Sequence, residues 1–227
     1  MLGERAGVAL PQTSMSEEDR KERGIRDRLL EINKIAATYY YRKLRSENGK
    51  AGLDYLKKRE LSDSTINSFG LGYATQSTGN LYKLLKDKGY DDDILKESGL
   101  FTYERGIHEK FWNRVIFPIM DINNKVIGFG GRVMGDAKPK YLNSPETRLF
   151  DKSRNLYGLN IARTSRKPNM IICEGYMDVI SMHQAGFNQA VASLGTALTP
   201  GHARLLKRYT DNVLITYDSD EAGVKAA

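Results

Sequence analysis

Three short apolar runs toward the C-terminal end of the sequence constrain the fold most. They are MIICEG at 170–175, AVASLG at 190–195 and VLITYD at 213–218, and the segments between them have helical spacing. An alternation of strand, helix, strand, helix and strand predicts a parallel sheet with crossover helices. We therefore expect an α/β fold for this part of the chain.

The preceding residues show a different pattern. Up to about residue 100 the spacing is mostly helical, and an apolar helical stripe starts at Ile25. RVIFPIMD and VIGFGGRVM then read as two strands joined by a hairpin turn at Asn123 and Asn124, and a basic, helix-like segment follows around 154–166. We expect a tail or linker, an α+β N-terminal subdomain and a truncated, Rossmann-like parallel-sheet domain. Their predicted bounds are 1–24, 25–166 and 167–227.

The positive charge is concentrated in one part of the chain. The whole sequence carries a net charge of +7, while residues 105–168 hold 13 Lys and Arg against 5 Asp and Glu. Such a block suits a polyanion, either nucleic acid or a nucleoside triphosphate, although a merely soluble basic face stays open. With no long apolar run and one cysteine, Cys173, we expect no membrane partner and a cytoplasmic location.

Acidic residues follow two of the three predicted parallel strands. Glu174 comes directly after the first strand, and Asp218 and Asp220 follow the third. Asp178 lies one helical turn beyond Glu174. Ligands bind at the carboxyl ends of parallel strands, and clustered carboxylates favour a divalent cation such as Mg²⁺ or Mn²⁺. This pattern indicates phosphoryl or nucleotidyl transfer, although an Asp-x-Asp alone can also begin a turn.

The same segments resemble a known catalytic module. CEGYMDVISMHQAGFNQAVASLGTALT followed by VLITYDSDEAG resembles the TOPRIM fold of primases, topoisomerases and some nucleases. RVIFPIMDINNKVIGFGGRVMG, PKYLNSPET and YLKKRELSDSTINSFGLGYA resemble segments of the bacterial DNA primase catalytic core. The resemblance covers nearly the whole chain.

The resemblance implies roles for particular residues. Glu174, Asp218 and Asp220 would be catalytic, and with Asp178 they would bind the metal ions. Residues matching positions that contact nucleotide or template are Arg114, Arg132, Lys140 and Asn143.

Other residues of the basic region carry expectations of their own. Gly128, Gly130 and Gly131 would allow the backbone to approach the triphosphate closely. We expect Phe111 and Trp112 to be packing residues.

The expected activity is metal-dependent synthesis of RNA primers from NTPs on single-stranded DNA. The family's zinc ribbon needs a Cys/His ligand set, so zinc is expected only in a preceding ribbon, and helicase binding only in a C-terminal domain beyond this chain. We also expect an exposed sheet edge. Two alternatives stay open: another TOPRIM enzyme, such as a topoisomerase or nuclease, or a DNA-binding module without catalysis. The module would bind DNA without a divalent ion and would tolerate Glu174→Gln.

Overall fold

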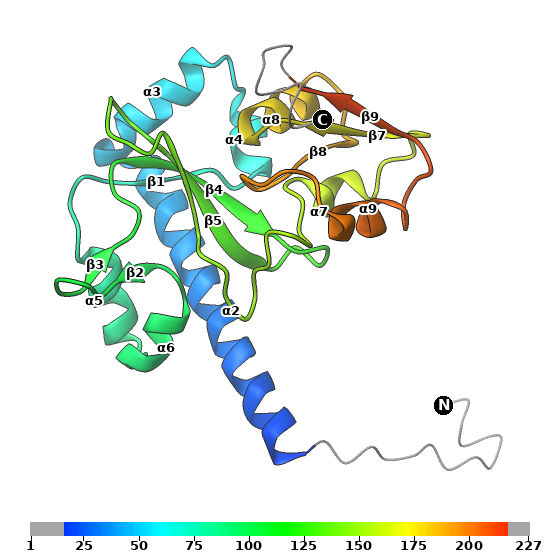
Figure 1. Ribbon diagram of the computed structural model, residues 1–227. Coiled ribbons are helices and arrows are strands. Elements are labelled where there is room, and N and C mark those ends of the chain that lie inside the picture. The colour runs from blue at the N-terminus through cyan, green and yellow to red at the C-terminus, as the bar shows by residue number, and fades with distance from the viewer. Residues whose placement is uncertain (1–15, 218–227) are drawn as a thin grey trace, which may run out of the picture.

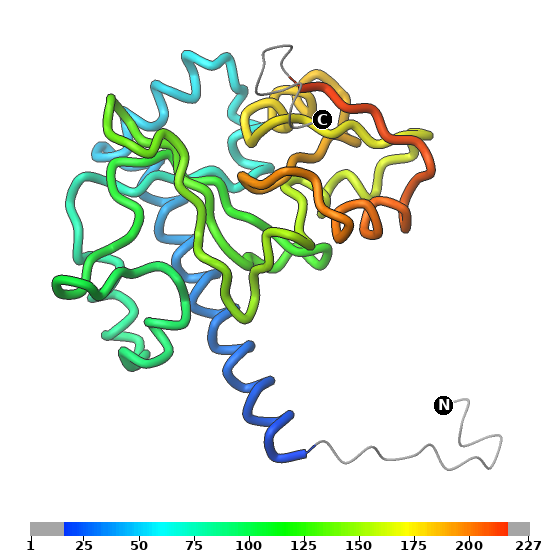
Figure 2. The backbone as a smooth tube through the Cα atoms, in the orientation of Figure 1, coloured from blue at the N-terminus to red at the C-terminus, as the bar shows by residue number. Residues whose placement is uncertain are grey.

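The chain forms two regions of different architecture that pack against each other. The computed structural model describes residues 16–217 (Figures 1 and 2). The helices are α2 (Glu17–Leu44), η1 (Glu47–Gly49), α3 (Lys50–Lys58), α4 (Asp63–Ser68), α5 (Asn80–Asp87), α6 (Asp92–Glu97), α7 (Leu159–Ala162), α8 (Tyr176–Gln184) and α9 (Pro200–Leu206). The strands are β1 (Gly72–Ala74), β2 (Phe101–Thr102), β3 (His108–Glu109), β4 (Arg114–Met120), β5 (Val126–Val133), β6 (Tyr141–Asn143), β7 (Met170–Cys173), β8 (Ala190–Ala192) and β9 (Val213–Thr216).

Helix α2 begins earlier than the sequence pattern indicates. The Ser16 hydroxyl accepts a hydrogen bond from the Asp19 amide at 3.0 Å, and the Asp19 carboxylate accepts one from the Ser16 amide at 3.3 Å. This capping box starts the helix at Glu17. The expectation of a tail through residue 24 is therefore wrong for residues 17–24. These turns extend beyond the rest of the molecule, so they have no apolar stripe to reveal the helix (Figure 2).

An antiparallel sheet with the strand order β1-β4-β5-β6 forms the centre of the first region. Helix α2 contacts β1 and β5 and buries Tyr40. The predicted hairpin is confirmed, because β4 pairs with β5 and Asn124 takes a φ of 59° in the turn. The Asp121 carboxylate accepts hydrogen bonds from the amides of Asn123 and Lys125 at 2.8 and 2.9 Å, which holds the turn closed.

The second region contains the predicted parallel sheet. Its order is β8-β7-β9, and both pairs of neighbouring strands are parallel. Helices α8 and α9 connect the strands, so the α/β prediction is confirmed. The expected helix around 154–166 is confined to α7. Gly158 precedes α7 with a φ of 80°, a conformation that cannot continue a right-handed helix from the residues before it.

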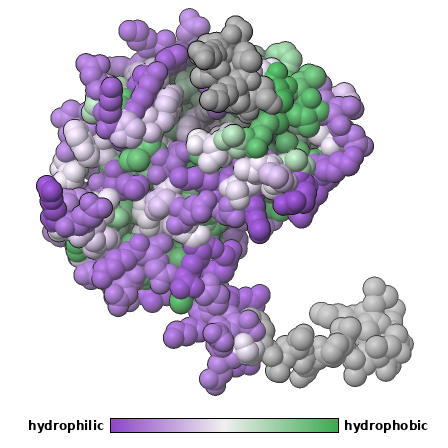
Figure 3. Space-filling model, viewed as in Figure 1, coloured by the Kyte–Doolittle hydropathy of each residue, from purple (hydrophilic) through white to green (hydrophobic). Residues whose placement is uncertain are grey.

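Strand β9 forms an exposed apolar edge. Within residues 16–217 it pairs with β7 alone, and Val213, Leu214 and Ile215 are 39%, 51% and 45% exposed. Figure 3 shows the resulting hydrophobic patch at the upper right, where Figure 1 places β9. This agrees with the expected exposed sheet edge.

A hydrophobic core spans the two regions, and a second, smaller cluster lies within the second region. The Tyr176 ring of α8 stacks on Phe117 of β4, with centroids 5.0 Å apart. At the other end of α8, the Gln184 side chain forms two hydrogen bonds with the first region. Its Oε1 accepts one from the Ser62 amide and its Nε2 donates one to the Glu60 carbonyl, both at 2.8 Å. The position of α8, and of the strand before it, is thus set by the first region.

Two further predictions concern the surface. Phe111 is fully buried as expected, but Trp112 is 47% exposed, so the packing role predicted for Trp112 is wrong. Adjacent side chains of an extended segment point to opposite sides, and only one of the two faces the core. No helix in the described part of the chain, residues 16–217, is long and apolar enough to cross a membrane.

Candidate functional site

Glu174 lies at the carboxyl end of the central strand of the parallel sheet. It directly follows Cys173, which is fully buried, while the Glu174 side chain is exposed. In the described residues its carboxylate has no hydrogen-bond or ion-pair partner. The strand therefore delivers an exposed carboxylate to solvent at the sheet edge where ligands of α/β proteins bind.

Asp178 lies on the first turn of α8 and stabilises the turn that carries Glu174. Its Oδ2 accepts a hydrogen bond from the Gly175 amide at 3.0 Å. The side chain remains exposed, so its other oxygen is available to a ligand. Glu174 and Asp178 together supply hard oxygen donors, which is the ligand type that Mg²⁺ and Mn²⁺ prefer.

The third predicted strand reaches the same edge. Cys173 pairs with Thr216 in the sheet, so the next residues, Glu174 and Tyr217, lie side by side. Burial raises the pKa of Tyr217, the hydrogen bond to Ser193 lowers it, and the charge of Glu174 raises it.

Asp218 and Asp220 follow Tyr217 and lie outside the described residues. Within residues 16–217, no three His, Cys, Asp or Glu side chains are close enough to hold a metal ion together. The four-carboxylate site therefore stays a prediction.

Arg132 contributes a cation from β5. Its guanidinium lies over the Tyr55 ring, 4.3 Å from the centroid, and Nη1 donates to the Val133 carbonyl at 3.0 Å. Its Nε is buried, and residues 16–217 offer it no hydrogen-bond partner. Arg132 pairs across the sheet with Tyr141, which directly follows the exposed Lys140. The two cations thus belong to one rim, and both keep donors available to an anion.

The electrostatics at Tyr141 indicate that this basic rim lies near the acidic edge. Burial raises the pKa of the Tyr141 hydroxyl, and the Tyr55 hydroxyl raises it further. The guanidinium groups of Arg132 and Arg59 lower it, and the carboxylate of Asp178 raises it. A cation from β5, a cation from the residue that follows α3 and a carboxylate from α8 therefore act on the same phenol.

Asn143 joins the two regions at this place. Its Oδ1 accepts a hydrogen bond from the Tyr176 hydroxyl at 2.7 Å, and its Nδ2 donates to the Leu194 carbonyl at 2.8 Å. The amide that was predicted to contact nucleotide or template thus ties β6 to α8 and to the loop after β8. In this arrangement Asn143 positions the edge that carries Glu174.

Two family descriptions match the chain. They are "DNA primase catalytic core, N-terminal domain" over residues 39–163 and "Toprim-like" over residues 171–227. The chain belongs to the DNA primase family.

Similar primases come from several bacteria. The chain is 51% identical to the DNA primase of Clostridium acetobutylicum over 88% of its length, and 46% identical to that of Deinococcus radiodurans over 99%. It spans 34% and 38% of those two proteins. A structure of the DnaG primase catalytic domain bound to ssDNA has a TM-score of 0.83 and 40% identity, covering 89% of this chain and 65% of that one. The Aquifex aeolicus primase structure, with zinc-binding and RNA polymerase domains, has a TM-score of 0.79 and 34% identity, covering 99% and 54%.

Arg114 does not face a groove. It is 6% exposed, and its Nη1 donates to the carbonyls of Gly131 and Pro139 at 3.2 and 3.0 Å. Burial lowers its pKa. The placement disfavours the predicted template contact and gives Arg114 a role inside the sheet, where it holds the segment before β6.

The glycines of β5 serve packing and not phosphate approach. A Cβ on Gly130 would stand 2.5 Å from Tyr176 Cζ, and a Cβ on Gly131 would stand 2.8 Å from Phe111 Cδ1. Both glycines are buried. The expectation that they let the backbone approach the triphosphate is therefore wrong, because aromatic rings occupy the space that the missing side chains leave.

Tyr55 and Arg59 were missed by sequence reasoning. They lie one turn apart at the end of α3, and their only signal was a place in the primase-like segment YLKKRELSDSTINSFGLGYA. Nothing in a short basic helix indicates that it meets β5. The contact with Arg132 becomes visible only once α3 is placed beside the sheet.

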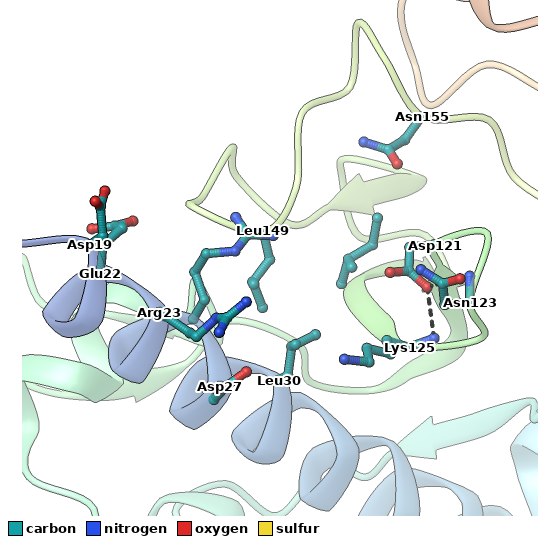
Figure 4. Close-up of a pocket in the computed structure, with 12 residues that line it drawn as sticks. Asp19, Glu22, Arg23, Asp27, Leu30, Asp121, Asn123, Lys125, Leu149 and Asn155 are labelled. Carbon is teal, nitrogen blue, oxygen red and sulfur yellow. Dashed lines mark hydrogen bonds between the residues drawn. The ribbon is translucent and has the colours of Figure 1, made fainter. Parts of the chain in front are cut away.

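A hollow of about 550 Å³ lies elsewhere, between α2 and the β4–β5 turn (Figure 4). Acidic and basic side chains alternate around it, and the Asp121 carboxylate accepts from the Lys125 amide there. It contains neither Glu174 nor Asp178. This hollow therefore does not belong to the acidic edge.

Proposed function

We propose that this chain carries part of the active site for RNA primer synthesis, the transfer of nucleotides from NTPs to a primer 3′-hydroxyl on a single-stranded DNA template. The observation that carries the proposal is the exposed Glu174 carboxylate, unpaired among residues 16–217, beside a basic rim in a chain of the DNA primase family. The Tyr176–Asn143 hydrogen bond, at 2.7 Å, fixes the edge to the rim. Acids alone would bind a cation, and bases alone an anion, whereas both together suit a metal-bound nucleotide.

In this proposal Glu174, Asp178, Asp218 and Asp220 hold divalent ions, Mg²⁺ or Mn²⁺. Such ions neutralise phosphate charge and favour deprotonation of the attacking hydroxyl. Glu174 provides a carboxylate at the place where the 3′-hydroxyl attacks the α-phosphate and pyrophosphate leaves.

Arg132 and Lys140 bind triphosphate or template phosphates. The Nη groups of Arg132 match the geometry of phosphate oxygens, and the aromatic face of Tyr55 holds the guanidinium in place. A similar structure that was determined with bound ssDNA supports single-stranded DNA as the template. A cytoplasmic location belongs to the same proposal, and the buried, unpaired Cys173 supports it.

The test is Mn²⁺ binding by calorimetry, combined with nucleotide incorporation on a primed single-stranded template. The full chain is compared with Glu174→Gln and with Asp218→Ala/Asp220→Ala. The control is Glu146→Gln, which removes an exposed carboxylate from a loop. Circular dichroism verifies that each variant is folded.

We expect saturable Mn²⁺ binding that both edge variants weaken and that Glu146→Gln leaves intact. Incorporation should fall at least about a hundredfold in Glu174→Gln, as for the loss of a general base or metal ligand. Equal Mn²⁺ binding in all variants would refute the metal site. DNA binding that needs no divalent ion and tolerates Glu174→Gln would favour a non-catalytic module.

A further inference from the structure

Three arginines converge on a hollow of about 390 Å³ beside α9. They are Arg154, Arg204 and Arg208, and Gly201 and Leu205 complete the lining. All three arginines are exposed. We call this surface the arginine hollow. Arg154 comes from a segment some fifty residues before the other two, so the tertiary structure assembles the hollow.

The backbone beneath the arginine hollow is held together by specific contacts. The Thr199 hydroxyl donates to the Ser153 carbonyl at 2.6 Å, and Nε2 of the buried His202 donates to the Lys152 carbonyl at 2.8 Å. A Cβ on Gly201 would stand 2.4 Å from the Ser153 oxygen, so only glycine permits this approach. The first turn of α9 is therefore clamped onto the segment that ends at Arg154.

The charges in the arginine hollow are poorly compensated. Arg154 reaches Asp151 at 3.5 Å, with side chains 77% and 45% exposed, so solvent screens the pair. For Arg204 and Arg208, the part of the chain that the structure describes contains no ion-pair partner. Asp211 is close in sequence, but it pairs with Lys207. Repulsion among the three guanidinium groups is relieved when an anion binds between them.

The positive surface continues beyond α9. The Thr210 hydroxyl donates to the Pro168 carbonyl at 3.1 Å, which brings the end of this segment beside Arg166 and Lys167. Those two exposed cations line a separate hollow with Thr164, Ser165 and Asn188. Helix α9 starts after the carboxyl end of β8 and leads back to the start of β9. The positive surface formed by the arginine hollow and by Arg166 and Lys167 therefore extends away from the edge that carries Glu174.

We propose that the arginine hollow binds phosphate groups of a nucleic-acid backbone. Arginine forks match phosphate oxygens bidentately. Arg204 lies on α9 and Arg208 lies in the turn that follows it, and both line the same hollow, so neighbouring phosphates can be bound in succession. Among the described residues that line the hollow, Leu205 alone adds an apolar side chain, whereas protein partners are recognised by aromatic and apolar groups. The inference rests on the proposed function only in taking nucleic acid as the polyanion.

The test measures fluorescence anisotropy of a labelled single-stranded oligonucleotide with the full chain, without NTPs or divalent ions. All variants are made in an Arg132→Gln/Lys140→Gln background, which removes the basic rim. Arg204→Gln/Arg208→Gln is compared with Lys207→Gln/Lys50→Gln, which loses the same charge at other exposed positions. Urea unfolding confirms that both are folded, and Arg154→Gln provides a second, single-site variant.

We expect the arginine pair to raise the dissociation constant about tenfold and to reduce the salt slope by about 1.4, the value for two single-strand phosphate contacts. Arg154→Gln should reduce the slope by about 0.7. Equal effects from the lysine pair would overturn the proposal. The proposal would also be overturned if the arginine pair left the oligonucleotide affinity unchanged but abolished binding of a polyglutamate peptide. That result would assign the hollow to an acidic protein segment. Glu174→Gln should leave this metal-free oligonucleotide binding unchanged. The test of the arginine hollow therefore does not depend on whether the catalytic proposal is correct.

Discussion

Replacing Gly130 by alanine should destabilise the junction between the two regions. The added Cβ would stand 2.5 Å from Cζ and 2.6 Å from the hydroxyl oxygen of Tyr176. Ordinary carbon contacts begin near 3.5 Å, so the ring must retreat by about 1 Å. It has little freedom to do so, because Phe117 stacks on it at 5.0 Å, the Tyr157 ring meets its edge at 4.7 Å and Asn143 holds its hydroxyl.

Overpacking of this kind costs about 1–3 kcal/mol, and we expect Gly130→Ala to lower the free energy of unfolding by that amount. The assay is urea denaturation followed by circular dichroism, with the slope checked for two-state behaviour. Gly24→Ala is the control: nothing lies within 4 Å of its added Cβ, and Gly24 lies inside α2. That change should stabilise the helix by up to about 1 kcal/mol.

A double-mutant cycle isolates the clash with the ring. In a Tyr176→Ala background the space is open, so Gly130→Ala should cost less than about 0.5 kcal/mol. The clash with the Tyr176 ring would be refuted if Gly130→Ala cost less than about 0.5 kcal/mol with Tyr176 present, or if it cost the same in both backgrounds. Because Tyr176 follows Glu174 by two residues, a confirmed clash should also weaken Mn²⁺ binding.

Three further changes test other features. Burial raises the pKa of Glu109 above 4.5, so protonated Glu109 contributes its full stabilisation of the fold below that pH, and this contribution is lost as pH rises through the folded pKa. Glu109→Gln should therefore flatten the decline of the free energy of unfolding with pH, measured by urea unfolding. An unchanged pH dependence would contradict this expectation. Ser16→Ala should destabilise the first turn of α2 by about 1 kcal/mol, which would be measured as faster hydrogen exchange of the Asp19 amide. An unchanged exchange rate would contradict the capping role of Ser16. Arg132→Gln should weaken NTP binding about tenfold in a fluorescence titration, while Arg163→Gln, an exposed control, should not.

Much of the architecture was predictable because it depends on local order along the chain. Runs of apolar residues between helical segments indicated the parallel sheet, and the Asn123–Asn124 turn indicated the β4–β5 hairpin. The position of Glu174 at a sheet edge followed from the same pattern. Matches to the primase family extended that reading to most of the chain.

Sequence patterns did not predict the features that depend on contacts between residues distant in the chain. The start of α2 was missed because a helix without a buried face leaves no periodic stripe, although its capping box is visible in the letters SEED. Arg114 and Asn143 have the residue types of ligand contacts, yet their polar groups are used on the protein itself.

The sequence by itself determined the parallel strands with their crossover helices, the β4–β5 hairpin and the carboxylate at the end of β7, because these depend on periodicities of two and of three to four residues and on local turn residues. Only the tertiary structure decided that Gly130 makes room for Tyr176, that Arg59 joins Arg132, and that Arg154 meets Arg204. These pairs are separated by 46, 73 and 50 positions in the chain. Their meeting is set by the packing of whole elements, which no pattern of neighbouring residues records.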